Sequence, residues 1–374
     1  MRVFKMFMSL FLLFGLLSAT PASAAVKSVD YYDIGDMDPE HRFYEAVERF
    51  VYMDIIDGYF QSDSYEEDGE TYEYSYVAVR PEEKITRAQF TKILVNALSL
   101  KVGAKTKEFS DVKASSWYYN YVRVASSQGI ITGRADGKFY PNEIITRDQM
   151  ATMIYRAFRN TVTFPATAKR FKDVPSTSFA YEAVGKLAAN GIVQGYGDTF
   201  KPHSPATRGQ AIAIMDRALY KENGEAADTA SITEVVDRNV KEEYRLTKEQ
   251  NLSALKTLYY ATTTGYHLSY SLDNMMMLEG IGGLDGTVSM EPIGVHSLNV
   301  VTAKKRLAEV RIDNLKYKVS FTSPDFSFSI NVNASGTACL KKGGDGKWKI
   351  YNIVLDEEFG GDWMTQMASK ANAS

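Results

Sequence analysis

Ile145-Thr146-Arg147-Asp148-Gln149 is the stretch that decides the fold, because the chain contains it in three versions. The other two are Ile85-Thr86-Arg87-Ala88-Gln89 and Ala206-Thr207-Arg208-Gly209-Gln210, at spacings of 60 and 61 residues. A near-constant period of this size is typical of repeat architectures, in which each module buries its apolar face against its neighbours. The phrase therefore predicts three related modules within the first 220 residues.

The modules agree well beyond the shared phrase. Phe109-Ser110-Asp111-Val112 and Phe171-Lys172-Asp173-Val174 open the second and third modules, and each is followed by a stretch with helical apolar spacing. The stretches end at Gly129 and Gly191, where a glycine caps a helix in the left-handed conformation without a Cβ penalty. A glycine-aspartate turn, an aromatic residue and a proline then lead to the shared phrase.

The threonine of the phrase predicts the start of a second helix in each module. Thr-x-x-Gln fits the capping box, in which the hydroxyl accepts one N–H and the glutamine reaches back to another. The arginine then occupies the first helical position, where free N–H groups and the helix dipole favour an anion. Its guanidinium matches a carboxylate in a bidentate manner. Alternatively, each arginine pairs with a neighbour's acid and only holds the modules together.

This order of motifs resembles the S-layer homology family, which tethers exported proteins to bacterial cell walls, over roughly residues 30 to 220. The resemblance implies a mostly α-helical triple repeat, a pseudo-threefold spindle with short hairpins. It also implies grooves between the modules that bind a secondary cell-wall polysaccharide bearing pyruvate ketals. The family more often has glutamate where this chain has Gln89, Gln149 and Gln210. Glutamine keeps the cap, removes a negative charge and so favours an anion there.

The resemblance also implies the site residues, with the pyruvate carboxylate meeting the arginines. They are Arg87, Arg147 and Arg208, the threonines Thr86, Thr146 and Thr207, the aspartates Asp111 and Asp173, and the aromatic residues Trp117 and Phe179. A turn or cap contact is the alternative role for the aspartates. Core packing is the alternative role for the aromatic residues.

The first module departs from the pattern. Asp54 stands where the glycine stop is expected, and the spacing places Asp36 at the aspartate of the opening motif, with Asp33 as an alternative. Residues 61–79 form an acidic, tyrosine-rich insertion that could shield the first groove or repel an anionic polymer. We therefore expect one of the three grooves to be inactive.

The first 24 residues read as a signal peptide. Arg2 and Lys5 precede an apolar run, and Ala22-Ser23-Ala24 is a small-residue cleavage signal. The run is shorter than the roughly 20 residues that span a bilayer, although an uncleaved anchor is the alternative. Cleavage changes the net charge from −3 to −5. We expect a secreted protein at the bacterial cell wall or S-layer surface, with no membrane contact after cleavage and no nucleic-acid partner.

The periodicity changes after a small, polar joint at residues 221–231. Residues 232–265 have helical spacing, whereas apolar and polar residues alternate after about Gly286, as in strands. Helices followed by an antiparallel sheet predict an α+β domain with a curved sheet. The order, ending at Trp348 to Ile353, resembles the nuclear-transport-factor-2-like superfamily, which includes enzymes, ligand binders and dimerising modules. The partner of this domain, a ligand or a protein, stays open.

We therefore expect a signal peptide at residues 1–24, repeats at 25–98, 109–160 and 170–220, a linker at 221–231 and an α+β domain at 232–365. The four histidines are scattered, with no zinc, nucleophile or phosphate-loop motif. We therefore expect no enzyme activity, cofactor or metal, and read the chain as a wall-anchored protein displaying a ligand-binding or dimerisation domain. A wall-tethered polysaccharide or peptide hydrolase is the alternative, and a lattice-forming protein is a third possibility.

Overall fold

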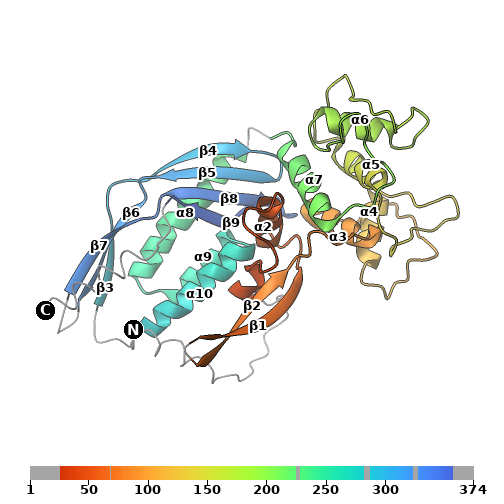
Figure 1. Ribbon diagram of the computed structural model, residues 1–374. Helices are drawn as coiled ribbons and strands as arrows, with labels where there is room; N and C mark the ends of the chain where they lie inside the picture. The colour runs from red at the N-terminus through yellow and green to blue at the C-terminus, as the bar shows by residue number, and fades with distance from the viewer. Residues whose placement is uncertain (1–25, 68, 225–227, 282–286, 323–326, 357–374) are drawn as a thin grey trace.

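The computed structural model describes residues 26–67, 69–224, 228–281, 287–322 and 327–356 (Figure 1). The predicted signal peptide lies outside the described residues. No helix among the described residues is both long enough and apolar enough to cross a membrane.

The repeat region is rich in helices, in partial agreement with the predicted mostly α-helical repeats. Each module has a short helix followed by a longer one that begins at the arginine of the shared phrase. The pairs are α2 (Tyr44–Tyr52) and α3 (Arg87–Ala97), α4 (Tyr119–Ser127) and α5 (Arg147–Phe158), and α6 (Tyr181–Ala189) and α7 (Arg208–Tyr220). The first module also contains the short 3₁₀ helix η1 (Val29–Tyr32) and an antiparallel hairpin of β1 (Tyr59–Glu67) and β2 (Glu70–Ala78).

The predicted capping boxes are confirmed. The Thr86 and Thr207 hydroxyls accept the N–H groups of Gln89 and Gln210 at 3.2 and 3.3 Å, and each glutamine accepts the N–H of its threonine in return. In the second module the Asp148 carboxylate joins the box and accepts the N–H of Gln149 at 2.8 Å. The three long helices therefore begin in the same way.

The predicted helix stops are confirmed as well. Gly129 and Gly191 adopt φ values of 68° and 73° after α4 and α6. Asp54 adopts φ of 55° at the corresponding place after α2. Aspartate is among the few non-glycine residues that tolerate this region. The Asp54 side chain also accepts hydrogen bonds from Lys27 and Tyr32, which offset the backbone strain.

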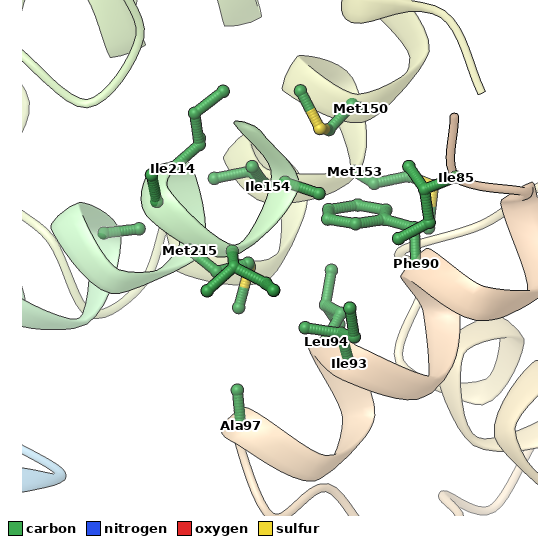
Figure 2. Close-up of a cluster of buried hydrophobic side chains, with 14 of the residues drawn as sticks. Ile85, Phe90, Ile93, Leu94, Ala97, Met150, Met153, Ile154, Ile214 and Met215 are labelled. Carbon is green, nitrogen blue, oxygen red and sulfur yellow. The ribbon is translucent and has the colours of Figure 1, made fainter. Parts of the chain in front are cut away.

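The core of the repeat region lies between the three long helices. Phe90 of α3, Ile154 of α5 and Met215 of α7 are fully buried there. Figure 2 shows these side chains converging from their three helices. Because each helix contributes one stripe of the core, no module buries its apolar face alone.

The C-terminal region has helices first and antiparallel strands afterwards, as predicted. The helices are α8 (Asp228–Lys248), α9 (Leu252–Thr262) and α10 (Gly265–Ile281). The strands are β3 (Thr287–Pro292), β4 (Ser297–Ala303), β5 (Leu307–Asp313), β6 (Lys316–Thr322), β7 (Ser327–Asn333), β8 (Gly336–Lys342) and β9 (Trp348–Leu355). They form a four-stranded sheet in the order β4-β5-β8-β9 and a three-stranded sheet in the order β3-β6-β7. Ile232 and Val236 of α8 pack in one core with Val310 and Ala338 of the four-stranded sheet.

The C-terminal region contacts the repeat region directly. The Tyr52 ring stacks on the Tyr266 ring at 4.2 Å, and the Tyr220 hydroxyl donates to the Glu309 carboxylate at 2.8 Å. Gly265 lies so close to α2 that an added Cβ would approach the Tyr52 carbonyl oxygen to 1.9 Å. The two regions therefore meet through aromatic stacking, polar contacts and close backbone approach.

Candidate functional site

The three shared phrases form a closed ring of hydrogen bonds. Ile145 N donates to Ile85 O at 3.0 Å, Ile85 N to Ala206 O at 3.1 Å, and Ala206 N to Ile145 O at 3.0 Å. Residues 60 or 61 positions apart therefore contact one another directly, and the third module closes onto the first.

The first N–H groups of each long helix are used in the same ring. Arg147 N and Asp148 N donate to the carbonyls of Ser204 and Pro202 in the following module, both at 3.0 Å. The corresponding N–H groups of α3 and α7 donate to carbonyls of the second and first modules. The prediction of free N–H groups at these helix starts is therefore wrong, because neighbouring modules supply the acceptors that a helix N-terminus lacks.

The three arginine side chains cross to the next module in the same cyclic order. Their Nε atoms donate to backbone carbonyls: Arg87 to Phe139 at 2.9 Å, Arg147 to Phe200 at 3.0 Å, and Arg208 to Val79 at 2.8 Å. Each of the three residues is only 6 to 8% exposed. The arginines do hold the modules together, but through carbonyls and not through an acid.

Among the described residues, none of the three guanidinium groups has a carboxylate within ion-pair distance. Burial lowers the pKa of Arg87, Arg147 and Arg208 from the usual value. A guanidinium nevertheless stays protonated in proteins. Each also lies near an aromatic ring, such as Phe200 at 4.5 Å from the Arg147 guanidinium. Each module boundary therefore holds a buried positive charge without a counterion among these residues.

The aspartates of the opening motif shape the turn beside each arginine. Asp173 accepts the N–H groups of Phe200 and Lys201, both at 2.7 Å. Asp111 binds the corresponding N–H groups in the second module. Asp36 does the same in the first module, which confirms the placement of Asp36 and not Asp33. The turn contact that was the alternative for these aspartates is thus present.

The residues that follow these turns have an unusual backbone. Arg80, Tyr140 and Lys201 adopt φ values of 56°, 59° and 56° at the same place in the three modules. Such values are uncommon outside glycine. The neighbouring aspartate accepts the N–H group of each of these residues and thereby stabilises the turn.

The predicted aromatic residues are on the surface. Trp117 and Phe179 are 54% and 64% exposed, so core packing, the alternative for them, is wrong. They directly precede Tyr118 and Ala180, the residues at the starts of α4 and α6. The first module has Arg42 at this place, before Phe43, and its guanidinium lies 3.7 Å from the Glu82 carboxylate.

The three boundaries differ in their surrounding charges. At the first, Arg134 pairs with Glu143 near Arg87. At the third, Arg80 pairs with Glu83 at 3.5 Å near Arg208. At the second boundary the acid near Arg147 is Asp173, whose carboxylate accepts two backbone N–H groups and forms no ion pair with a described side chain.

We name the second boundary the Arg147 site, made of Arg147, Tyr196 and Lys201. The exposed Tyr196 ring lies 5.2 Å from the Arg147 guanidinium and 4.3 Å from the Lys201 ammonium. Among the described residues, no ion pair within 4.0 Å engages Arg147 or Lys201. Tyr196 and Lys201 were not predicted from the sequence, because the second module has Arg134 and Tyr140 at the corresponding positions and the residue types are therefore not repeated. This site therefore combines two cations with an aromatic face.

The predicted threonines are occupied by the fold. The Thr86 and Thr207 hydroxyls accept helix N–H groups, and the Thr146 hydroxyl contacts the Asp148 carboxylate. The imidazole of His203 also lies 3.3 Å from that carboxylate. Among the described residues, no cluster of histidine, cysteine and acidic side chains is suited to a metal ion.

Comparisons with known proteins agree with this architecture. The chain is 37% identical over 146 residues to an endoglucanase from Bacillus sp. (strain KSM-635), covering 38% of this chain and 15% of that protein. It is 28% identical over 150 residues to a cellulosome-anchoring protein from Acetivibrio thermocellus, covering 38% of this chain and 33% of that protein. It is 26% identical over 305 residues to a surface-layer 125 kDa protein from Lysinibacillus sphaericus, covering 73% of this chain and 25% of that protein.

The chain thus spans a third or less of each of these relatives' lengths. The model of the S-layer homology domain matches residues 108–151 and 170–212, which are the second and third modules. The first module makes the same ring contacts through Ile85 and Arg87. The second and third modules therefore match the S-layer homology domain, and the chain is similar to a cellulosome-anchoring protein and a surface-layer protein.

Proposed function

We propose that the repeat region anchors this protein non-covalently to the bacterial cell wall. It does so by binding an anionic secondary wall polysaccharide, with pyruvate ketals as the carboxylates, in the grooves between modules of a pseudo-threefold spindle. The protein is secreted and resides at the wall or S-layer surface. The C-terminal region, with its curved sheet, is then a displayed ligand-binding or dimerisation domain.

The Arg147 site is the observation that carries this proposal. It presents a buried guanidinium and a lysine ammonium that both lie close to one exposed tyrosine ring. A carboxylate bound there meets two positive charges and displaces no acidic partner among the described residues. The aromatic face beside it suits the apolar side of a sugar ring. We therefore rank this boundary first among the three.

The names of the relatives support anchoring over catalysis. One is called an endoglucanase, one a cellulosome-anchoring protein and one a surface-layer protein, yet each matches this chain over a part of its own length. The matching part is then a module that proteins of different names have in common, and the name of the cellulosome-anchoring protein supports an anchoring role for it.

Co-sedimentation with purified cell wall tests the proposal. We expect the protein to sediment with native wall and to remain in solution after acid removal of the secondary polysaccharide. Arg147→Ala should weaken sedimentation most, Arg208→Ala less, and Arg87→Ala least. Arg159→Ala, at the exposed C-terminal end of the same helix as Arg147, is the matched control and should bind normally.

Two results would count against the proposal. Undiminished binding to stripped wall would show that the polysaccharide is not the ligand. Equal losses for the three arginine variants would remove the ranking, and with it the argument from the Arg147 site.

A further inference from the structure

The insertion of the first module forms a regular hairpin with tyrosines on one face. β1 and β2 pair residue for residue, with Tyr65 opposite Tyr72 and Asp63 opposite Tyr74. Alternate residues of a strand point to the same side, so Tyr72, Tyr74 and Tyr76 lie on the face that carries Tyr65. Neighbouring ring centroids are 5.3 to 6.1 Å apart along this row. We call the row the tyrosine face.

The tyrosine face is exposed. Tyr65 and Tyr74 are 51% and 45% exposed, and Figure 1 shows the hairpin extending along the edge of the molecule. The opposite face carries no tyrosine among the described residues of the hairpin; there the Ser62 and Ser75 hydroxyls lie 3.2 Å apart. A row of exposed aromatic side chains on one side of a ribbon marks a binding surface and not a solvated loop.

The tyrosine face continues into the boundary at Arg208. Tyr59 begins β1 on the same side as Tyr65, since the two positions differ by an even number. The Tyr59 ring lies 5.6 Å from the Arg208 guanidinium and 4.0 Å from that of Arg80. A ligand that reaches Arg208 therefore meets Tyr59, which lies on the same side of the hairpin as the tyrosine face.

The charge of the hairpin defines the chemistry of the occupant. Residues 59–78 contain six acids and no lysine or arginine. Asp63 and Glu70 share the tyrosine face by register, and the Tyr72 hydroxyl donates to the Glu70 carboxylate at 3.0 Å. Aromatic rings combined with carboxylates attract ammonium groups through cation–π and ionic attraction. An anionic segment is repelled by the same charges.

We propose that the tyrosine face binds sugars that carry free ammonium groups, as N-deacetylated amino sugars of a wall glycan do. This deepens the proposed wall anchoring, on which it rests: the carboxylate of one sugar lies at Arg208, and cationic sugars further along the same chain lie on the hairpin. A second copy of this hairpin does not fit, since two strongly acidic faces would oppose each other. The insertion thus selects a polymer of mixed charge and does not merely shield a groove.

Calorimetric titration of the whole protein with chitosan hexasaccharide, which carries free amines, tests this directly. The fully N-acetylated hexasaccharide is the matched ligand without charge. We expect measurable binding of the first and at least about fivefold weaker binding of the second. The double variant Tyr65→Ser/Tyr74→Ser removes the rings, and Asp63→Asn/Glu70→Gln keeps the rings and removes charge. Both should bind the amine-bearing oligomer at least about fivefold more weakly.

Ser62→Ala/Ser75→Ala changes the opposite face of the same hairpin and should bind normally. Equal binding of the two hexasaccharides, or full binding by both tyrosine-face variants, overturns the inference. So does a tyrosine variant that alters self-association in sedimentation velocity while oligosaccharide binding stays unchanged. Wall co-sedimentation that survives Arg147→Ala/Arg208→Ala is a separate outcome. It refutes the anchoring role of the grooves and leaves the hexasaccharide result intact.

Discussion

Replacing Arg147 by alanine should separate the structural part of this side chain's role from the binding part. The guanidinium donates to Phe200 O at 3.0 Å and to Gln194 O at 2.7 Å, so it joins the second module to the third. Hydrogen bonds from a charged group contribute about 1.5 to 3 kcal/mol each when buried. Water in the groove can reach the carbonyls that remain, so we expect a net loss of about 3 kcal/mol in the free energy of unfolding.

Urea unfolding followed by circular dichroism measures this loss. Arg147→Lys keeps the charge but lacks the planar fork, and should lose about half as much as alanine. Arg159→Ala should change the free energy by at most about 0.5 kcal/mol. An unchanged urea midpoint for Arg147→Ala would refute the reasoning, since it would show that the contacts to the third module carry no stability.

The binding part is isolated by Lys201→Asn. Asparagine tolerates the left-handed backbone at this position, so we expect little change in stability. Wall binding should nevertheless fall, because one of the two cations at the Arg147 site is lost. Normal wall binding by a stable Lys201→Asn variant would remove lysine from the proposed site.

Two further predictions concern the junctions between elements. Burial raises the pKa of Asp216 to about 6, with Arg49 and Arg217 partly opposing the shift. An acid whose pKa is raised in the folded state lowers the free energy of unfolding as pH rises from about 4 to 6. The free energy of unfolding of Asp216→Asn should therefore exceed that of the wild type by up to roughly 3 kcal/mol at pH 7 and equal it at pH 4. Urea midpoints of the wild type and the variant between pH 4 and pH 7 test this prediction. A variant that is less stable than the wild type at pH 7 would show that the ion pair with Arg49 outweighs the cost of burying the carboxylate. Gly265→Ala should loosen the C-terminal region from α2 and increase its cleavage in limited proteolysis, because the new Cβ collides with a carbonyl. Gly197→Ala has a similar positive φ of 65° but open space around it, so the proposed mechanism fails if both variants are cleaved alike.

Much of the repeat region could be predicted because its signals are local. The capping boxes and the glycine stops depend on a few adjacent residues. The spacing also placed Asp54 at the position of a glycine stop, although its left-handed conformation was not predicted. Asp36 could be found by spacing alone, since the turn that it caps occupies the same place in each module.

The partners of the arginines could not be predicted, because they are backbone carbonyls. A carbonyl has no signature in the sequence, and Arg87 reaches one that lies 52 residues away. The same reason hid the acceptors for the helix N–H groups. The hairpin was expected only as an acidic insertion, although its alternating tyrosines at 72, 74 and 76 agree with a strand.

The closed hydrogen-bond ring through Ile85, Ile145 and Ala206 has a consequence for evolution by duplication. An open solenoid can gain or lose a repeat, since each unit contacts only its neighbours and the end units need polar caps. Here there are no end units: the last module completes the first. A fourth copy would have no place in this hydrogen-bond ring and two copies would leave it open, so each of the three modules of this chain depends on both of the others.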